Sequence, residues 1–289
     1  MKLLLSGANG LLGSAILNEA ARRSFGADAF MRRQAWDTPV GRLPELLAGH
    51  DWFIHCAANT NVEQCETDPS ACYRDNLLLT EMLARAAHAA SMRFVLVSST
   101  GVYGTASDEP YREYDAVAPT THHHRSKVLA EQAVLALHPD NLVIRTGWLF
   151  GGAAANPKNF VARRLEEARA AAISGTVLRS NAEQWGVPSY VGDVAARLLD
   201  LAAAGHAGVF NCVDGGRASR FDYVQEIVRL AGLPVEVQPI AADAFGRKAR
   251  VSHNEMAENW KAQQLGFAPM PDWRESLGEY VASLLAKMA

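Results

Sequence analysis

The sequence has few cysteines and no long apolar run, and both absences limit what the chain can be. Its four cysteines, among 289 residues, form no Cys-x-x-Cys pair and no metal-ligand spacing. This pattern favours reduced thiols over a disulfide framework or a zinc site. A membrane span needs roughly 18 consecutive apolar residues, and no such stretch is present. The opening apolar run is too short for a signal peptide, so we expect a cytoplasmic protein with no membrane partner.

A strong charge of either sign is also lacking. The chain carries 28 Lys and Arg against 31 Asp and Glu, a formal net charge of −3. Because nucleic-acid binders present a basic face, we expect no nucleic-acid partner. With 49% hydrophobic and 20% charged residues, the chain can bury a sizeable core as one large domain, or as a nucleotide domain with a smaller lobe.

The most informative stretch is at residues 2–13, KLLLSGANGLLG. An apolar run is followed by glycines at 7, 10 and 13 and then by an amphipathic segment. A buried strand, a tight turn and a helix N-terminus in this order can hold the pyrophosphate of a dinucleotide; an ordinary structural turn is the alternative. We expect Gly7 to make the turn, Gly10 to admit the phosphate and Gly13 to let the helix pack. The coenzyme contacts expected here are Gly7, Asn9, Gly10, Leu11, Leu12 and Gly13.

A second short strand is predicted at residues 28–31, ending in Arg32 and Arg33. In dinucleotide-binding folds the end of this strand lies beside the adenine ribose. An acidic residue there accepts a hydrogen bond from the 2′-hydroxyl, whereas Arg neutralises a 2′-phosphate. The two arginines therefore favour NADP(H), with NAD(H) as the other choice; a solvated surface pair is the competing interpretation.

Strands and helices alternate over the first half of the chain. Strands are predicted at 52–56, 94–97 and 142–144, and helices at 43–47, 69–90 and 126–137. Such alternation predicts an α/β fold with a doubly wound parallel sheet of the Rossmann type, and residues 1–150 as the dinucleotide-binding domain. Ligands bind beyond the carboxyl ends of such strands. The residues expected at these ends are Gly7, Ala57, Ser99 and Thr146.

Residues 151–289 are predicted to complete the sheet and to form a small C-terminal substrate lobe. A turn-rich passage opens this mixed segment. Helices are then predicted at 160–172, 194–204, 221–231 and 273–288, and strands at 176–179, 209–212 and 235–240.

Several motifs together resemble one family almost from end to end. They include the glycine loop, Asp75-Asn76, Ser98-Ser99, Ser126-Lys127 and Gly186-Val187-Pro188. With these motifs the chain resembles the extended short-chain dehydrogenases/reductases, and within them the dTDP-4-dehydrorhamnose reductase group.

The resemblance implies hydride transfer from NADPH to a ketone of a nucleotide-linked 6-deoxysugar, with a homodimer as the usual assembly. In the family, a Tyr gives the proton, a Lys four residues later holds the nicotinamide ribose, and a Ser or Thr hydroxyl binds the substrate oxygen. Here the hydroxyl and lysine roles fall to Ser99 and Lys127. The implied coenzyme contacts also include Cys56, Ala57, Ala58, Asn76, Ser98 and Lys127. The implied substrate contacts are Thr60, Trp148, Asn159 and Trp185; for Trp185, filling the lobe interface is the alternative to stacking on the base.

The tyrosine of the family is missing, and His123 stands in its place. An unperturbed phenol has a pKa of about 10 and an imidazolium of about 6.5. A positive Lys127 nearby favours the neutral imidazole, which is a poor proton donor. Three interpretations follow: His123 acts as acid or electrophile, a water held by Ser99 delivers the proton, or the chain is a catalytically impaired NADP(H)-binding regulatory or partner subunit.

The run of three histidines at 122–124 also suggests a metal site at first sight. Successive residues on a helix point about 100° apart, so these three side chains cannot surround one ion, and we expect no metal. The positions where sugar-nucleotide dehydratases carry an Asp-Glu pair are here Thr100-Gly101, so dehydration is not expected either.

Overall fold

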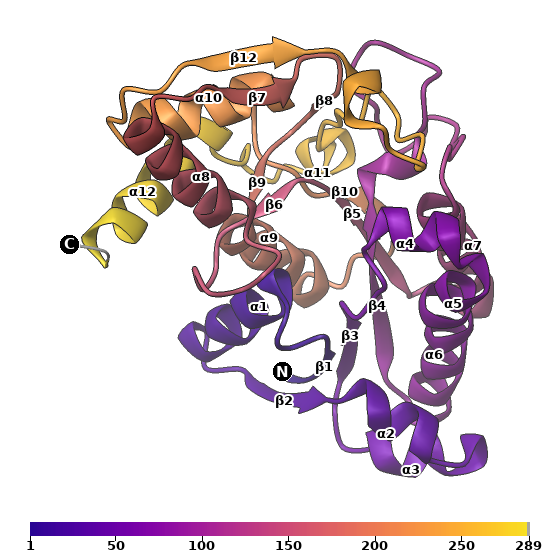
Figure 1. The fold of residues 1–289 in the computed structure, drawn as a ribbon. Helices are drawn as coiled ribbons and strands as arrows, with labels where there is room; N and C mark the ends of the chain where they lie inside the picture. Colours follow the sequence, from indigo (N-terminus) through magenta and orange to yellow (C-terminus); the bar gives the residue numbers. More distant parts are fainter. Residues whose placement is uncertain (288–289) are drawn as a thin grey trace.

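The computed structural model describes residues 1–287 and is built around one six-stranded sheet (Figure 1). All of its strands are parallel, in the order β10-β5-β4-β3-β1-β2. This arrangement confirms the predicted doubly wound α/β fold. The six strands are β1 (Lys2–Ser6), β2 (Gly26–Phe30), β3 (Trp52–His55), β4 (Arg93–Ser99), β5 (Leu142–Thr146) and β10 (Gly208–Asn211).

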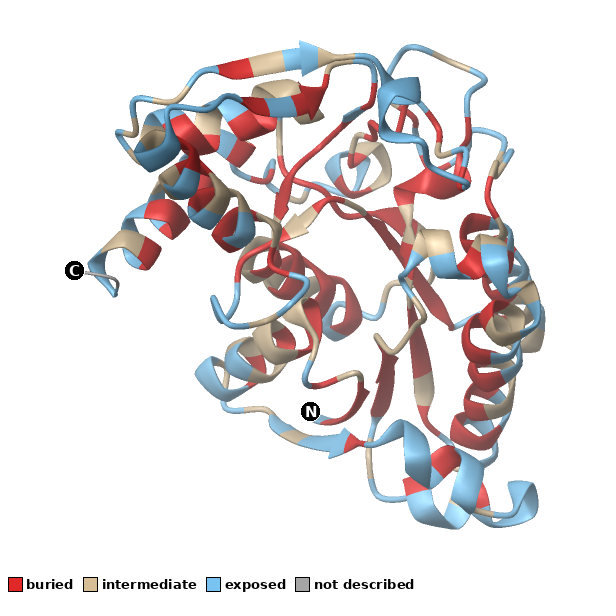
Figure 2. Cartoon of the chain, in the orientation of Figure 1, coloured by how far each residue is buried: buried red, intermediate tan, exposed pale blue. Residues whose placement is uncertain are grey.

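Both faces of the sheet are buried under helices, as Figure 2 shows by the burial of the central strands. Successive residues of a strand point to opposite faces. Leu3 and Leu5 accordingly pack in the core with α1 (Leu11–Arg22) and α9 (Val191–Ala203). Leu4, between them, packs in the core on the other face. That face is covered by α3 (Leu43–Leu47), α6 (Leu79–Ala89) and α7 (His122–Leu137).

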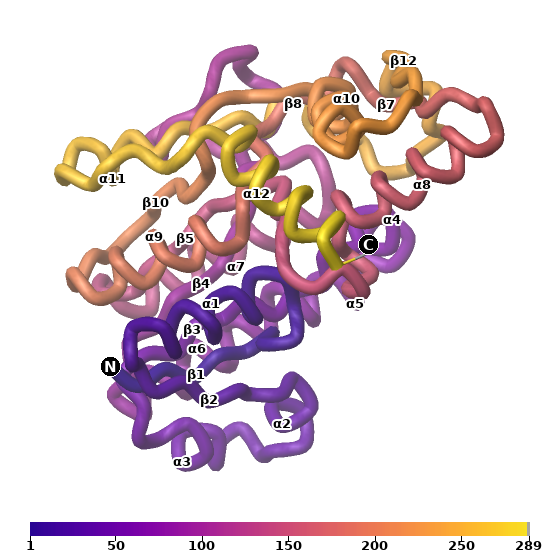
Figure 3. Tube along the Cα trace, turned by 90° about the vertical axis from the view of Figure 1, so that its left-hand side faces the viewer, coloured from indigo at the N-terminus to yellow at the C-terminus, as the bar shows by residue number. Residues whose placement is uncertain are grey.

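The second half of the chain contributes to both the sheet and a separate layer. β10 pairs with β5 at the edge of the sheet, and Figure 3 shows α9 and β10 beside β5. Many other apolar residues of this half form two further cores in the lobe. The lobe contains α8 (Phe160–Ser174), α10 (Arg220–Leu230), α12 (Trp273–Ala286), and the paired strands β7 (Leu178–Asn181) and β12 (Val237–Ile240).

Short elements make the connections. The helical ones are α2 (Arg32–Asp37), η1 (Val40–Arg42), α4 (Val62–Thr67), α5 (Pro69–Tyr73), the π-helical turn η2 (Arg74–Leu78), η3 (Thr100–Val102), η4 (Ala242–Phe245) and α11 (Trp260–Gln264). The short strands are β6 (Leu149–Phe150), β8 (Trp185–Gly186), β9 (Ser189–Tyr190) and β11 (Ala218–Ser219). No helix within residues 1–287 is long and apolar enough to cross a bilayer.

Several element boundaries differ from the prediction. The second strand ends at Phe30, because Met31 donates its N–H to Gln34 Oε1 at 2.7 Å and a helix starts at Arg32. The helix predicted at 126–137 starts four residues earlier, because the Thr121 side chain accepts the N–H of His124 and caps it. The last helix ends at Ala286, and Met288, where it was predicted to end, lies outside the described residues.

Gly13 allows α1 to lie directly on the first turn. A Cβ at this position would lie 2.1 Å from the carbonyl oxygen of Gly7. We predict that Gly13→Ala lowers the free energy of unfolding by about 1–3 kcal/mol, as overpacking does, or by more if α1 cannot shift. Urea unfolding measures this change. Gly41→Ala is the matched control, because nothing lies within 4 Å of its Cβ; equal losses in the two variants would contradict the close-packing argument.

Candidate active site

A cavity of about 1060 Å³ lies at the carboxyl ends of the strands, where the sheet meets the lobe. Parallel strands bring their carboxyl ends to one edge, so β1, β3, β4 and β5 all deliver residues to it. Its lining from the sheet half includes Gly7, Asn9, Gly10, Leu11, Leu12, Gly13, Arg32, Cys56, Ala57, Ala58, Thr60, Ser98, Ser99, His123 and Lys127. This volume lies at the upper end of the usual range for small-molecule sites.

The glycine loop has the shape that a phosphate group needs. Gly7 has a φ of +75°, and a Cβ there would lie 2.7 Å from the backbone nitrogen of Ala57. Gly10 donates its N–H to the Gly7 carbonyl at 2.9 Å, which closes the turn. The first N–H groups of α1 have no partners within the helix, and its first turn carries no acidic residue. The loop therefore fits a pyrophosphate on its backbone.

Of the two arginines predicted to bind a 2′-phosphate, only one lines the cavity. Arg32 does, and its guanidinium is ion-paired with the buried Asp75 carboxylate. Arg33 points away: its side chain is 90% exposed and lies 3.5 Å from Asp37 on the same helix. The early start of α2 causes this difference, because two neighbours on a helix diverge by about 100°.

Asn76 is buried within the protein and does not line the cavity, contrary to its predicted coenzyme contact. Its Oδ1 accepts the N–H of Asn59 at 2.7 Å, and its Nδ2 donates to Ser126 Oγ at 3.0 Å. The residue sits in the π-helical turn between α5 and α6, a local widening that is frequent near functional sites. Asn76 therefore holds the loop after β3 against α7.

The two serines at the end of β4 face different partners. Ser98 Oγ donates to the Glu131 carboxylate, and Arg145 Nη2 binds that carboxylate at 2.7 Å. Within residues 1–287, Ser99 Oγ makes one hydrogen bond, accepting the N–H of Gly101 at 3.2 Å. Since an accepting hydroxyl keeps its own hydrogen, Ser99 can still donate to a ligand in the cavity.

His123 and Lys127 lie one turn apart on α7 and share one of its faces. Both side chains are buried in the cavity wall, at 6% and 4% exposure. Burial, with the nearby His124 and Lys127, lowers the pKa of His123 to about 3. Burial lowers the pKa of Lys127 to about 8, against the opposing effect of Glu131. Close to neutral pH the pair is therefore a neutral imidazole and an acidic ammonium.

Trp148 lines the cavity on the side of the lobe. It has a φ of +47°, an uncommon conformation for a residue with a side chain. Its Nε1–H donates to Glu255 at 2.7 Å, and the Arg220 guanidinium lies 3.4 Å above the ring. A Cβ on Gly186 would lie 2.4 Å from the ring, so the glycine gives the indole its space.

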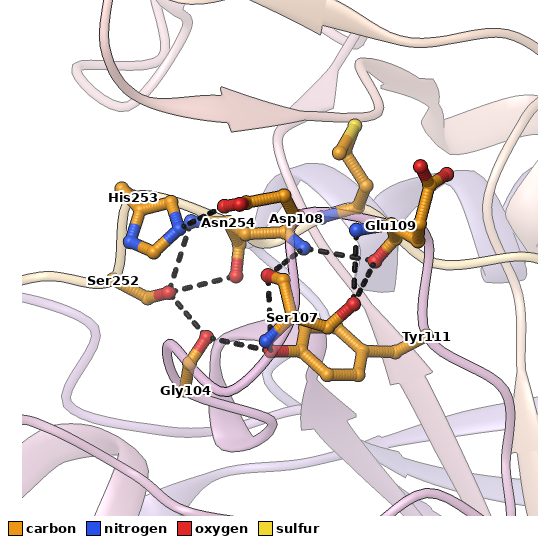
Figure 4. A network of polar contacts seen from close by, with 9 residues as sticks. Gly104, Ser107, Asp108, Glu109, Tyr111, Ser252, His253 and Asn254 are labelled. Atoms are coloured by element: carbon orange, nitrogen blue, oxygen red, sulfur yellow. Dashed lines mark hydrogen bonds and ion pairs between the residues drawn. The ribbon is translucent and has the colours of Figure 1, made fainter.

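A polar network fastens residues 252–254, which precede Glu255 in the chain (Figure 4). Asn254 Nδ2 donates to the carbonyls of Ser107 and Glu109 at 2.7 and 2.9 Å. His253 Nε2 lies 2.8 Å from Asp108 Oδ1. These contacts fasten the residues around 254 to the loop after β4, which fixes the position of the Trp148 partner.

The other predicted substrate contacts are distributed unevenly. Thr60 lines the cavity, and its Oγ1 accepts a hydrogen bond from Lys158 Nζ at 2.7 Å. Asn159 does not line it, because its side chain caps α8 and binds the Gly151 and Ala153 carbonyls. Trp185 lines a separate cavity of about 320 Å³. It is the strand neighbour of Gly186, which faces Trp148, so its own side chain points to the other side.

A group of arginines on the lobe side was not identified from the sequence. The cavity lining contains five arginines: Arg163 and Arg164 on α8, Arg179, Arg220 and Arg247. Burial and its positive neighbours Arg163 and Arg247 lower the pKa of Arg164. In the sequence, the adjacent arginines at 163–164 were the sign of such a group, but only the fold brings them close to the other three arginines.

Comparisons with known proteins agree with this architecture. The model of the RmlD substrate binding domain family matches residues 1–286. A dTDP-4-dehydrorhamnose reductase of Mycobacterium tuberculosis is 34% identical, covering 98% of this chain and 93% of the relative.

Two crystal structures of dTDP-4-dehydrorhamnose reductases are similar over almost their whole length. The enzyme of Clostridium acetobutylicum has a TM-score of 0.91 at 28% identity, over 99% of this chain and 100% of the other. The enzyme of Bacillus anthracis, solved in complex with NADP, has a TM-score of 0.88 at 26% identity, over 98% and 100% of the two chains. The chain therefore belongs to the RmlD substrate binding domain family, as its motifs predicted.

Proposed function

We propose that this chain is an NADPH-dependent reductase of a 4-keto group on a nucleotide-linked 6-deoxysugar. The observation that carries the proposal is that one cavity joins the glycine loop, Ser99, Lys127 and the arginine group of the lobe. The relatives named as dTDP-4-dehydrorhamnose reductases support the same reaction. A chain that only bound the coenzyme would have no need of a buried lysine beside a free serine hydroxyl, so the non-catalytic alternative is less favoured.

The coenzyme site is built from backbone groups and small side chains. The glycine loop and the N-terminus of α1 would hold the pyrophosphate, and Arg32 the 2′-phosphate. Ala57 and Ala58 leave space beside the backbone, and burial raises the pKa of the Cys56 thiol to about 12, which keeps it neutral. NADPH, when bound, supplies a hydride to the carbonyl carbon.

The lobe end of the cavity fits the diphosphate of a sugar nucleotide. Arg163, Arg179 and Arg247 are exposed around it, and none of them is ion-paired with a carboxylate of residues 1–287. The guanidinium fork matches phosphate oxygens in pairs. Lys158, whose ammonium donates to the Thr60 hydroxyl, adds one more cation near the junction with the coenzyme site. Trp148 and Thr60 would then lie beside the sugar.

The reductase assay is the direct test of this function. We expect purified wild-type protein to oxidise NADPH when a dTDP-linked 4-keto-6-deoxysugar is added. Ser99→Ala should lower kcat by roughly 100-fold, since it removes a hydrogen bond to the developing charge on the substrate oxygen. A different result would support the non-catalytic binding subunit: the wild type would bind NADPH tightly without turnover, and His123→Tyr would show turnover.

The preference for NADPH is tested by a matched pair of arginine variants. Arg32→Ala should weaken NADPH binding by roughly 10- to 100-fold, the effect of losing a hydrogen bond to a charged group, and leave NADH binding nearly unchanged. Isothermal titration calorimetry measures both affinities. Arg33→Ala should change neither, because Arg33 lies outside the cavity. Equal losses for the two coenzymes would refute the 2′-phosphate role of Arg32.

We further propose a homodimer, which the resemblance implies, and a cytoplasmic location, which the sequence analysis predicted. Sedimentation velocity of the purified protein tests the first, and cell fractionation tests the second.

A further inference from the structure

The hydrogen bonds of His123 determine which of its ring nitrogens carries the proton. Nδ1 lies 2.9 Å from the carbonyl oxygen of Asn59. A carbonyl can only accept, so Nδ1 must be the donor. Nδ1 also lies 3.4 Å from Asn76 Nδ2, but that amide has shorter acceptors in Ser126 Oγ at 3.0 Å and the Asn59 carbonyl at 3.1 Å. The neutral ring is therefore the Nδ1–H form.

In this form Nε2 presents a lone pair and has no proton to give. No hydrogen bond to Nε2 is formed within residues 1–287, and His123 lines the cavity. To become a donor there the ring must be protonated, and burial with Lys127 and His124 nearby opposes that by holding its pKa at about 3. His123 thus occupies the position of the family tyrosine as a hydrogen-bond acceptor.

Apart from Lys127, the groups that line the cavity leave few sources of a proton. The Lys158 ammonium also lines the cavity, but it already donates to Thr60 Oγ1 at 2.7 Å. No tyrosine from the described part of the chain lines the cavity. His124, whose pKa burial lowers to about 4, is neutral, and the Cys56 thiol, with a pKa of about 12, is a weaker acid than a phenol. The Ser99 hydroxyl can donate a hydrogen bond but holds its proton too tightly to release it.

Lys127 differs from all of these groups. Its ammonium group makes no hydrogen bond or ion pair within residues 1–287, although the side chain is only 4% exposed. The groups that face it are Glu131 on its own helix, Cys72 on α5, His55 and Cys56 at the end of β3, and His123. The Glu131 carboxylate is already bound by Arg145 and Ser98, so its charge is largely neutralised by other partners.

We propose that Lys127 itself delivers the proton to the carbonyl oxygen of the substrate, while His123 serves as an acceptor that the Asn59 carbonyl holds in one tautomer. This inference rests on the proposed reductase function and deepens it. Asn59 and Asn76 become positioning residues for His123.

The step balances in atoms and charge. The hydride forms the new C–H bond at the carbonyl carbon, an Nζ–H bond of Lys127 breaks, and the substrate oxygen gains the O–H bond. Lys127 becomes a neutral amine as the nicotinamide ring becomes positive, so the buried cavity does not gain a second charge. Solvent reprotonates Lys127 once the product has left.

Nuclear magnetic resonance tests the protonation states without any turnover. In protein with ¹⁵N-labelled histidine, we expect His123 to show the neutral Nδ1–H form from pH 5 to pH 9. In protein with ¹³C-labelled lysine, the Lys127 Cε signal should titrate near pH 8. The His123 resonance is assigned by its absence in His123→Gln, and the Lys127 resonance by its absence in Lys127→Arg. An Nε2–H tautomer or an imidazolium at pH 7 would overturn the proposal.

The pH dependence of kcat tests the proton donor itself. An acid must be protonated to act, so activity should be full below the pKa of Lys127 and fall as the pH rises through about 8. His123→Gln should keep this alkaline limb at the same pH. A wild-type limb near pH 6.5 that disappears in His123→Gln would assign the proton to His123 instead.

Two variants of Lys127 separate proton donation from charge. Lys127→Ala should lose roughly 100- to 10,000-fold in kcat, the usual contribution of a general acid, and small alkylammonium ions should restore activity at rates that follow their pKa. Lys127→Arg keeps the positive charge but holds its proton too tightly, so it should bind NADPH and remain slow. A fast Lys127→Arg enzyme would refute this role of Lys127 and leave the reductase function standing. Absence of wild-type turnover would refute the function itself, while the resonance experiment still decides the tautomer of His123.

Discussion

The close contact between Gly13 and the carbonyl of Gly7 is the constraint on which the site depends. It lets α1 begin immediately beyond β1 and pack on the sheet together with α9. The N-terminus of α1 then points into the same edge at which β3, β4 and β5 end. Any side chain larger than hydrogen at position 13 would move the helix and with it the donors that face the cavity.

A second constraint is the cost of burying charged side chains behind the reacting groups. Glu131 and Arg145 form an ion pair that is shielded from solvent, with Ser98 binding the same carboxylate. A buried carboxylate without partners would be costly, and Arg145 and Ser98 supply those partners below the cavity. The Lys127 ammonium, by contrast, has no hydrogen-bond or ion-pair partner within residues 1–287, as its proposed role of proton donor requires. The same helix therefore carries a satisfied charge and an unsatisfied one, a single turn apart.

The replacement of the family tyrosine involves more than one residue. The His123 ring depends on the Asn59 carbonyl, and Asn59 is held in turn by Asn76 in the π-helical turn. His124, which follows it, packs its ring against Gly101, where a Cβ would lie 2.2 Å from the imidazole. An imidazole pair thus fits this wall because a glycine and an asparagine provide its space and its hydrogen bonds.

Local patterns in the sequence were sufficient to predict the strand–turn–helix at the N-terminus, the parallel sheet and the residues at its strand ends. The turn and the strand ends follow from spacings within a few residues, because apolar periodicity and glycine positions act over one element. The parallel sheet follows from the alternation of such elements along the first half of the chain. The start of α2 at Arg32, which turns Arg33 away, was already harder to predict, since a single backbone contact from Met31 sets it.

The tertiary structure decided the features that depend on contacts between distant elements. It buried Asn76 and Asn159 in the protein, turned Trp185 away from Trp148, gathered five arginines from α8, β7, α10 and the segment near 247, and placed the Asn59 carbonyl against His123. No spacing within one segment encodes these contacts. They arise because a buried polar group must find a partner, and packing alone determines which partner lies within reach.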